Sequence, residues 1–176
     1  SKIDGLSDSR IAQLAYHEAL NRIIIAYQNG NLDLILETGD IINISDILES
    51  QSIIGSKRIN DIFIYNQFAF LSCDFGLVKF DVENLEISED YRNLSKSSVS
   101  QLNVYSCQIL DDPDSIFLST SQGILNAPFS SNINLQDVNN WILRDSAYSI
   151  PLRNLGNLAR IDNSLFTYGI VNDSTY

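Results

Sequence analysis

Histidine, cysteine and clustered carboxylates are the side chains with which this chain could carry out catalysis or bind a metal ion. The sequence has one histidine, His17, and two cysteines, Cys73 and Cys107. A Ser-His-Asp triad would have to use His17, which opens the polar segment 17–21 and is interpreted as a solvated surface group. A zinc site needs three or four ligands at suitable spacing. One histidine and two distant cysteines therefore predict none.

Both cysteines belong to apolar runs of the sequence. Cys73 lies in the run that begins at Phe68, and Cys107 lies at the end of another run. This placement predicts two buried free thiols, because unpaired cysteine behaves as a small hydrophobic side chain. A disulfide stays open, because two cysteines give no framework from which to deduce a pairing.

Clustered carboxylates suggest two further kinds of site. Segment 111–114 (DDPD) is rich in the oxygen ligands that calcium prefers, but it lacks the EF-hand pattern, and Asp-Pro is ordinary in a hairpin turn. A carboxylate pair for glycoside hydrolysis could come from four residues: Glu37, Asp40, Glu83 and Asp90. Such pairs arise by chance in an acidic chain. We therefore expect no enzyme activity, cofactor or metal, and the ligand-binding residues stay unknown.

Composition bounds the class of protein. The chain has 176 residues, 44% of them hydrophobic, and a net charge of −11. It is long enough for one domain with a core, and it has no basic patch with which to bind a nucleic acid. It contains no methionine and no apolar segment typical of a signal peptide. We therefore expect it to be a piece excised from a longer protein, without that protein's targeting segments.

Short apolar runs separated by polar pauses recur along the sequence. Segment 68–81 (FAFLSCDFGLVKFD) resembles segments 23–35 and 116–125, and a further run precedes each of the three. The alignment makes five sets of residues equivalent: Ile11, Ile59 and Val99; Gln13, Asp61 and Gln101; Leu14, Ile62 and Leu102; Tyr16, Ile64 and Val104; Ala26, Leu71 and Leu118. A weaker fourth copy begins near residue 155. The runs are rich in Ile, Val, Tyr and Phe, which predicts strands.

Each copy predicts an antiparallel meander, because the polar pauses hold the Asn, Asp and Gly residues of tight turns. Segments 40–44 and 85–91 offer a fourth strand. Four-stranded units that recur about every 40–50 residues are typical of β-propeller blades. We therefore predict an all-β partial propeller of three to four blades, at about 9–47, 57–92, 98–141 and, incomplete, 155–176. Segments 44–52 and 135–145 are predicted helical excursions between blades.

A partial propeller leaves the faces of its terminal blades uncovered, so the fragment is expected to associate with itself.

Aromatic side chains near strand or loop ends could stack on sugars: Tyr65, Tyr91, Tyr105 and Trp141. Packing in the core is the interpretation that we prefer for these rings.

The blade pattern resembles a known family. Segments 5–35, 42–47 and 59–87 are similar to the N-terminal propeller of PorZ-type proteins of the type IX secretion system, and the resemblance covers residues 5–95 well. The periplasmic sensor propellers of Bacteroidetes hybrid two-component histidine kinases share the pattern. Their blades carry a Leu-Trp-Ile-Gly-Thr strand, whereas the strands here read IIIAY, AFLSC and IFLST. This departure favours the PorZ-type resemblance.

The resemblance implies a binding or scaffolding role in the periplasm or at the outer cell surface. PorZ-type proteins act in surface protein secretion and lipopolysaccharide attachment, so protein partners or a surface glycan are expected and nucleic acid is not. The sensor relatives imply the alternative, a periplasmic propeller that binds polysaccharide breakdown products. The resemblance supplies no catalytic residue for either role.

Overall fold

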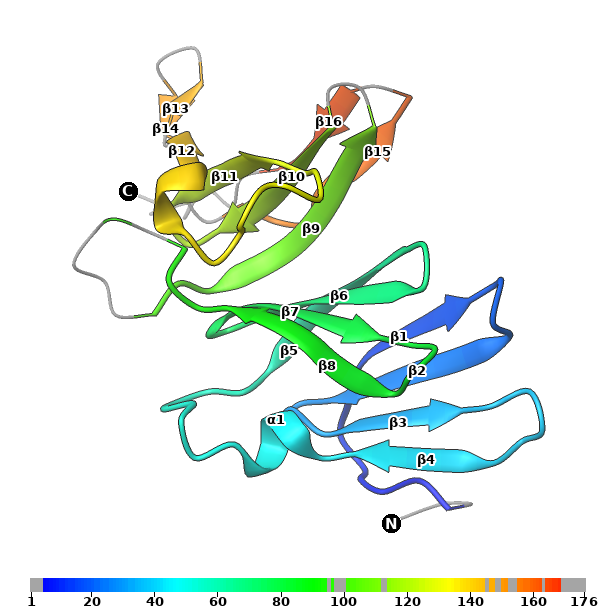
Figure 1. The fold of residues 1–176 in the computed structure, drawn as a ribbon. Coiled ribbons are helices and arrows are strands. Elements are labelled where there is room, and N and C mark those ends of the chain that lie inside the picture. Colours follow the sequence, from blue (N-terminus) through cyan, green and yellow to red (C-terminus); the bar gives the residue numbers. More distant parts are fainter. Residues whose placement is uncertain are drawn as a thin grey trace, which may run out of the picture.

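The structure, a computed structural model, describes residues 5–168 except 95, 97–100, 112–113, 145, 148–149, 152–154 and 163. The described residues form three four-stranded antiparallel sheets and two short hairpins, and each larger sheet has its strands in sequential order. Figure 1 shows the three sheets following one another along the chain. The expected all-β partial propeller is confirmed.

The elements follow one another in a regular order. The first sheet comprises β1 (Ile11–His17), β2 (Arg22–Tyr27), β3 (Leu32–Ile35) and β4 (Ile41–Ile44). The second comprises β5 (Ile59–Tyr65), β6 (Phe68–Cys73), β7 (Gly76–Asp81) and β8 (Glu86–Tyr91). The third comprises β9 (Val104–Asp111), β10 (Asp114–Thr120), β11 (Gly123–Pro128) and β12 (Ile142–Arg144). The remaining elements are α1 (Asp46–Glu49), η1 (Val138–Asn140), β13 (Ser146–Ala147), β14 (Ile150–Pro151), β15 (Ala159–Ile161) and β16 (Ser164–Phe166).

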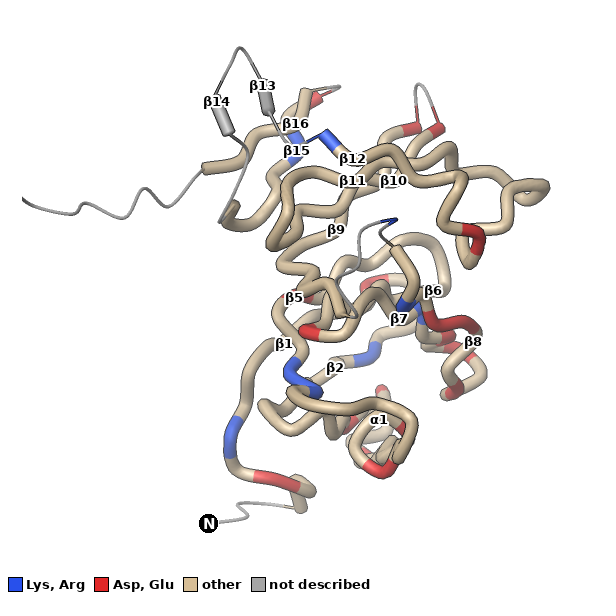
Figure 2. Tube along the Cα trace, turned by 90° about the vertical axis from the view of Figure 1, so that its left-hand side faces the viewer, with Lys and Arg blue, Asp and Glu red and all other residues tan. Residues whose placement is uncertain are grey.

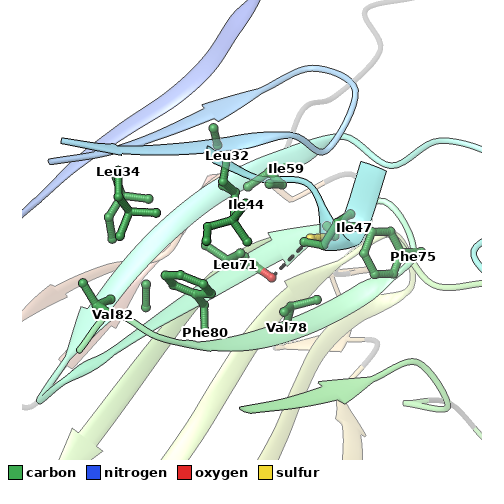
Figure 3. Packing of buried hydrophobic residues seen from close by; sticks show 14 of the residues in the cluster. Leu32, Leu34, Ile44, Ile47, Ile59, Leu71, Phe75, Val78, Phe80 and Val82 are labelled. Atoms are coloured by element: carbon green, nitrogen blue, oxygen red, sulfur yellow. Dashed lines mark hydrogen bonds between the residues drawn. The ribbon is translucent and has the colours of Figure 1, made fainter. Parts of the chain in front are cut away.

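The apolar core between the first and second sheets comes from strands that face one another. Figure 3 shows Leu32, Leu34 and Ile44 of the first sheet packed toward Leu71 and Phe80 of the second. The single turn of α1, within the segment predicted to be helical, adds Ile47 to this core. Successive residues of a strand point to opposite faces of its sheet, so a middle strand buried on both sides must be apolar throughout.

A second apolar core joins the second and third sheets. Phe70 and Leu77 point away from the first sheet and pack with Leu118 and Leu125 of the third. Trp141, just before β12, packs there too. The second sheet is therefore covered on both faces.

The first strands of the three sheets lie side by side. β5 contacts both β1 and β9. The Gln13 side chain donates to the carbonyl of Asn60, and the Asn60 side chain donates to the carbonyl of Val104. The Ser106 hydroxyl donates to the Asp61 carboxylate at 2.8 Å, and burial raises the pKa of Asp61. Polar hydrogen bonds thus set the positions of the first strands relative to one another.

The third copy of the repeat begins later than the sequence alignment predicts. Its first strand starts at Val104 rather than Val99, which lies outside the described residues. The register of β9 makes Val104 the equivalent of Ile59, because a register shift follows each of these residues. The alignments of Gln101 with Asp61, of Leu102 with Ile62 and of Val104 with Ile64 are therefore wrong. The residues that occupy these positions are Ser106, Cys107 and Ile109.

Two further sequence interpretations need correction. Ala26 pairs with Gln13 as Ser72 pairs with Asp61, so Ile25, not Ala26, is the equivalent of Leu71. A shift of one residue in a strand moves a side chain to the other face of the sheet. Segment 135–145, predicted as a helical excursion between blades, has the single turn η1 among its described residues. It then continues into the strand β12, which pairs with β11 and so belongs to the third sheet.

Gly76, the first residue of β7, shows how closely β7 approaches β8. It has a φ of +135°, and a Cβ built there would lie 2.2 Å from the carbonyl oxygen of Tyr91. Gly39 also has a positive φ, +87°, but a Cβ at that position would meet nothing within 4 Å. We predict that Gly76→Ala lowers the free energy of unfolding by about 2 kcal/mol more than Gly39→Ala, as measured by urea denaturation. Equal losses would contradict the close approach of Gly76 to β8.

Candidate ligand-binding groove between the second and third sheets

The one histidine is part of the interface between sheets rather than a surface group. His17 is 2% exposed, so the prediction of a solvated side chain is wrong. The backbone N–H of Leu20 donates to Nδ1, so the ring proton is on Nε2, which donates to the carbonyl of Asn66 at 2.8 Å. Asn66 lies in the β5–β6 turn with a φ of 53°. His17 therefore connects the first sheet to that turn and contacts backbone groups on both sides.

The prediction of two buried free thiols is confirmed. Cys73 lies in the core between the first two sheets, and Cys107 lies in the core between the second and third. Burial raises the pKa of both thiols well above its usual value, which disfavours the reactive thiolate.

The candidate carboxylates are spread over separate turns and strands. Glu37 and Asp40 are exposed at the β3–β4 turn, and Glu83 is exposed at the β7–β8 turn. Asp90 forms an ion pair with Arg92. Segment 111–114, considered above for calcium, includes Asp112 and Pro113, which lie outside the described residues. Among the residues that are described, no three His, Cys, Asp or Glu side chains come together to hold a metal.

A groove with a volume of about 530 Å³ opens between the second and third sheets. The second sheet and its turns contribute five of the lining residues: Tyr65, Asn66, Lys79, Glu89 and Tyr91. The third sheet and the loop between β11 and β12 contribute the other six: Asp114, Phe129, Ser130, Ser131, Ile133 and Leu135. Neither sheet forms this groove alone.

Aromatic rings form one wall of the groove. Tyr65 and Phe129 meet edge to face, with ring centroids 5.6 Å apart, and Phe129 also contacts the buried Phe70. Tyr65 and Phe129 are both partly exposed. The Tyr65 hydroxyl donates to Asp111 at 3.3 Å. Of the aromatic residues considered from the sequence, Tyr65 and the buried Tyr91 both line the groove. Trp141 is buried, as expected for packing in the core, and Tyr105 is partly exposed and is not among the lining residues.

An ion pair lies beside the aromatic wall. Lys79 Nζ is 3.1 Å from a carboxylate oxygen of Glu89 and also lies over the Phe68 ring, 4.2 Å from its centroid. The buried Tyr91 hydroxyl donates to Glu89. Burial, and then the charge and hydrogen bond of Glu89, raise the pKa of Tyr91. One carboxylate therefore binds both an ammonium and a phenol group.

This ion pair replaces an apolar pair at the same position of the repeat. Lys79 pairs across the second sheet with Phe70, as Leu34 of the first sheet pairs with Ile24. The outer-strand partners are Glu89 for Lys79 and Ile42 for Leu34. Leu34 is fully buried in the first core. The first interface between sheets is thus closed by apolar side chains where the second presents charged ones.

Sequence reasoning missed Lys79 and Glu89 as candidate site residues. Lys79 is the one charged residue between Gly76 and Phe80, which is the signal that could have drawn attention to it. Its importance depends on register, because only strand pairing shows that Leu34 is its equivalent.

The sequence of this chain matches a described family. The model for the TSS9 (type IX secretion system) PorZ N-terminal β-propeller domain matches residues 1–142. The chain belongs to this family. The PorZ-type resemblance seen in the sequence is therefore confirmed. A separate comparison with curated protein sequences found no significant match.

Solved structures share the fold. One is PorZ, an essential bacterial surface component of the type IX secretion system of Porphyromonas gingivalis, with a TM-score of 0.75 and 24% identity. Another is the extracellular domain of the hybrid two-component system BT4673 from B. thetaiotaomicron, with a TM-score of 0.68 and 15% identity. Each match covers 94% of this chain, but only 20% of the PorZ chain and 21% of the BT4673 chain. The chain thus spans about a fifth of those proteins.

The apolar pair of the first sheet suggests a stability test of the ion pair. Lys79→Leu combined with Glu89→Ile recreates the pair Leu34 and Ile42. Because Glu89 also accepts a hydrogen bond from the buried Tyr91 hydroxyl, the variants are made in a Tyr91→Phe chain. We predict that the double variant keeps the free energy of unfolding within about 1 kcal/mol of that Tyr91→Phe chain, or raises it, because apolar replacements of partly buried ion pairs are tolerated. Glu89→Ile alone leaves the Lys79 ammonium, 19% exposed, without its carboxylate and should cost about 1–2 kcal/mol.

Urea denaturation of the three variants measures these differences. Lys79→Leu alone completes the cycle and gives the coupling between the two side chains. A double variant that is less stable than Glu89→Ile alone would contradict the equivalence of the two interfaces.

Proposed function

We propose that this chain is a non-catalytic, PorZ-like binding or scaffolding propeller that acts outside the cytoplasm in surface protein secretion and lipopolysaccharide attachment. The observation that carries the proposal is the family match over residues 1–142. The similarity to a structure of PorZ, a surface component of the type IX secretion system, supports it.

The proposal of a non-catalytic role draws on the described side chains. The buried histidine contacts backbone groups, the thiols are buried in the cores, and the candidate carboxylates lie on separate turns and strands. A separate finding concerns membranes: the helical segments that the structure describes are all too short to span one.

An alternative function is supported by the second structural likeness. The BT4673 domain is extracellular and belongs to a hybrid two-component system. The chain would then be the ligand-sensing periplasmic propeller of a histidine kinase. Both functions use a propeller as a binding module, and they differ in the membrane with which the whole protein is associated.

The ends of the row of sheets bear apolar side chains that a partner could cover. On β1, Ile11, Leu14 and Tyr16 are 48%, 63% and 53% exposed. Near the other end, Ile142 and Phe166 are 56% and 52% exposed. We propose that these surfaces pack against further sheets or, when the chain is alone, against a second copy of it.

Membrane fractionation distinguishes the two functions. Antibodies raised against the chain would follow the whole protein through a density gradient that separates the inner and outer membranes of the source organism. We predict that it travels with the outer membrane. Recovery with the inner membrane would contradict the secretion role and support the sensor role.

A further inference from the structure

The groove between the second and third sheets has the chemistry of a site for an uncharged sugar. We propose that it binds a short stretch of neutral saccharide through the Lys79–Glu89 pair and the aromatic wall of Tyr65 and Phe129. This inference deepens the proposed function, on which it rests, by assigning a ligand class to one surface of the binding module.

The charges of the groove favour a ligand without net charge. Its charged lining residues are one lysine and two carboxylates, Lys79, Glu89 and Asp114. Glu89 already neutralises Lys79, so an anionic ligand would gain little from the ammonium and would be repelled by Asp114. A cationic ligand would meet Lys79, which already occupies the face of the Phe68 ring. Figure 2 shows acidic and basic residues interspersed along the described chain.

The ion pair can bind adjacent hydroxyl groups at the same time. Lys79 is a donor with three protons, and Glu89 is an acceptor with two oxygens. They lie 3.1 Å apart, so neighbouring ring hydroxyls, each able to donate and accept, can bridge both. Glu89 is 38% exposed and Lys79 19%, so both side chains retain access to the groove. Asn66, Ser130 and Ser131 are exposed at the margin and add further polar groups.

The aromatic wall supplies the apolar part of the site. Ligand sites combine apolar and aromatic walls with a few polar groups that fix orientation. Tyr65 and Phe129 are held edge to face, and Phe129 is also held by Phe70 below it. The partly exposed rings can therefore cover the carbon-bound hydrogens of a sugar ring without moving. The volume of about 530 Å³ lies within the range of small-molecule sites.

The comparison of interfaces supports a functional reason for the ion pair. At the equivalent position the first interface uses Leu34 and Ile42, which need no hydrogen-bond partner. An ion pair at an interface is seldom better for stability than apolar packing. Departures from a structural pattern are expected at functional sites, and this departure coincides with the groove.

A printed glycan array followed by calorimetry tests the proposal on the whole chain. The array should carry neutral oligosaccharides and matched uronate- or phosphate-bearing ones. We predict binding to neutral members, weakened at least tenfold by Lys79→Leu/Glu89→Ile and by Phe129→Ala. Ile54→Ala is the control, because Ile54 is 81% exposed, lies outside the groove and belongs to neither end of the row of sheets, so it should leave affinity unchanged.

A second experiment compares purified lipopolysaccharide from the source organism with the sugar chain released from it. The comparison shows whether the groove recognises the sugar itself or needs the attached lipid. Binding of the released chain, sensitive to the double variant, would support sugar recognition at the groove. Binding of the lipid-linked form alone, preference for anionic glycans, absence of binding to every neutral glycan, or insensitivity to the variants would overturn the proposal. Because the membrane location is measured separately, outer-membrane recovery with no glycan binding would refute this site and leave the secretion role standing.

Discussion

A β-sheet that is apolar on both faces is stable only when a neighbour covers each face. The second sheet meets this requirement, because Leu71 packs toward the first sheet and Phe70 toward the third. The hydrogen bonds among the first strands, and the contact of His17 with the β5–β6 turn, fix how the sheets lie relative to one another. Burial of apolar surface between the sheets contributes the stability, at about 25 cal/mol per Å². The polar contacts set the positions of the sheets relative to one another.

The same constraint explains how a repeated scaffold can carry a specific site. Each interface must be filled along most of its length, but its margin can open without exposing the core. At the second interface the margin has Lys79 and Glu89, backed by the buried Tyr91. Since these side chains stand on paired strands rather than on a long loop, their positions are set by the sheet. The proposed binding surface thus combines a change of two side chains on paired strands with Phe129 from the loop after β11.

Much of the fold could be predicted from the sequence because the runs are short, apolar and separated by turn residues. Both fourth strands expected at 40–44 and 85–91 are present as β4 and β8. The third sheet is harder to predict, since the apolar residues Val99 and Leu102 predict a strand that starts before Val104. The prediction for His17 is wrong because local polarity does not show which neighbouring turn covers a side chain. The groove could not be foreseen, because it comes from two sheets and from the register that relates Lys79 to Leu34.

The central claim is that each apolar sheet face needs a neighbour to cover it. Light scattering coupled to gel filtration tests this claim most directly. The account predicts that the 176-residue chain associates as its concentration rises, because Leu14 and Tyr16 leave the outer face of β1 apolar and exposed. Leu14→Glu should shift it toward the monomer, whereas Glu37→Gln, at an exposed turn, should not. A strict monomer at high concentration, with the unmodified sequence, would contradict the claim that each sheet face in this fold requires a partner.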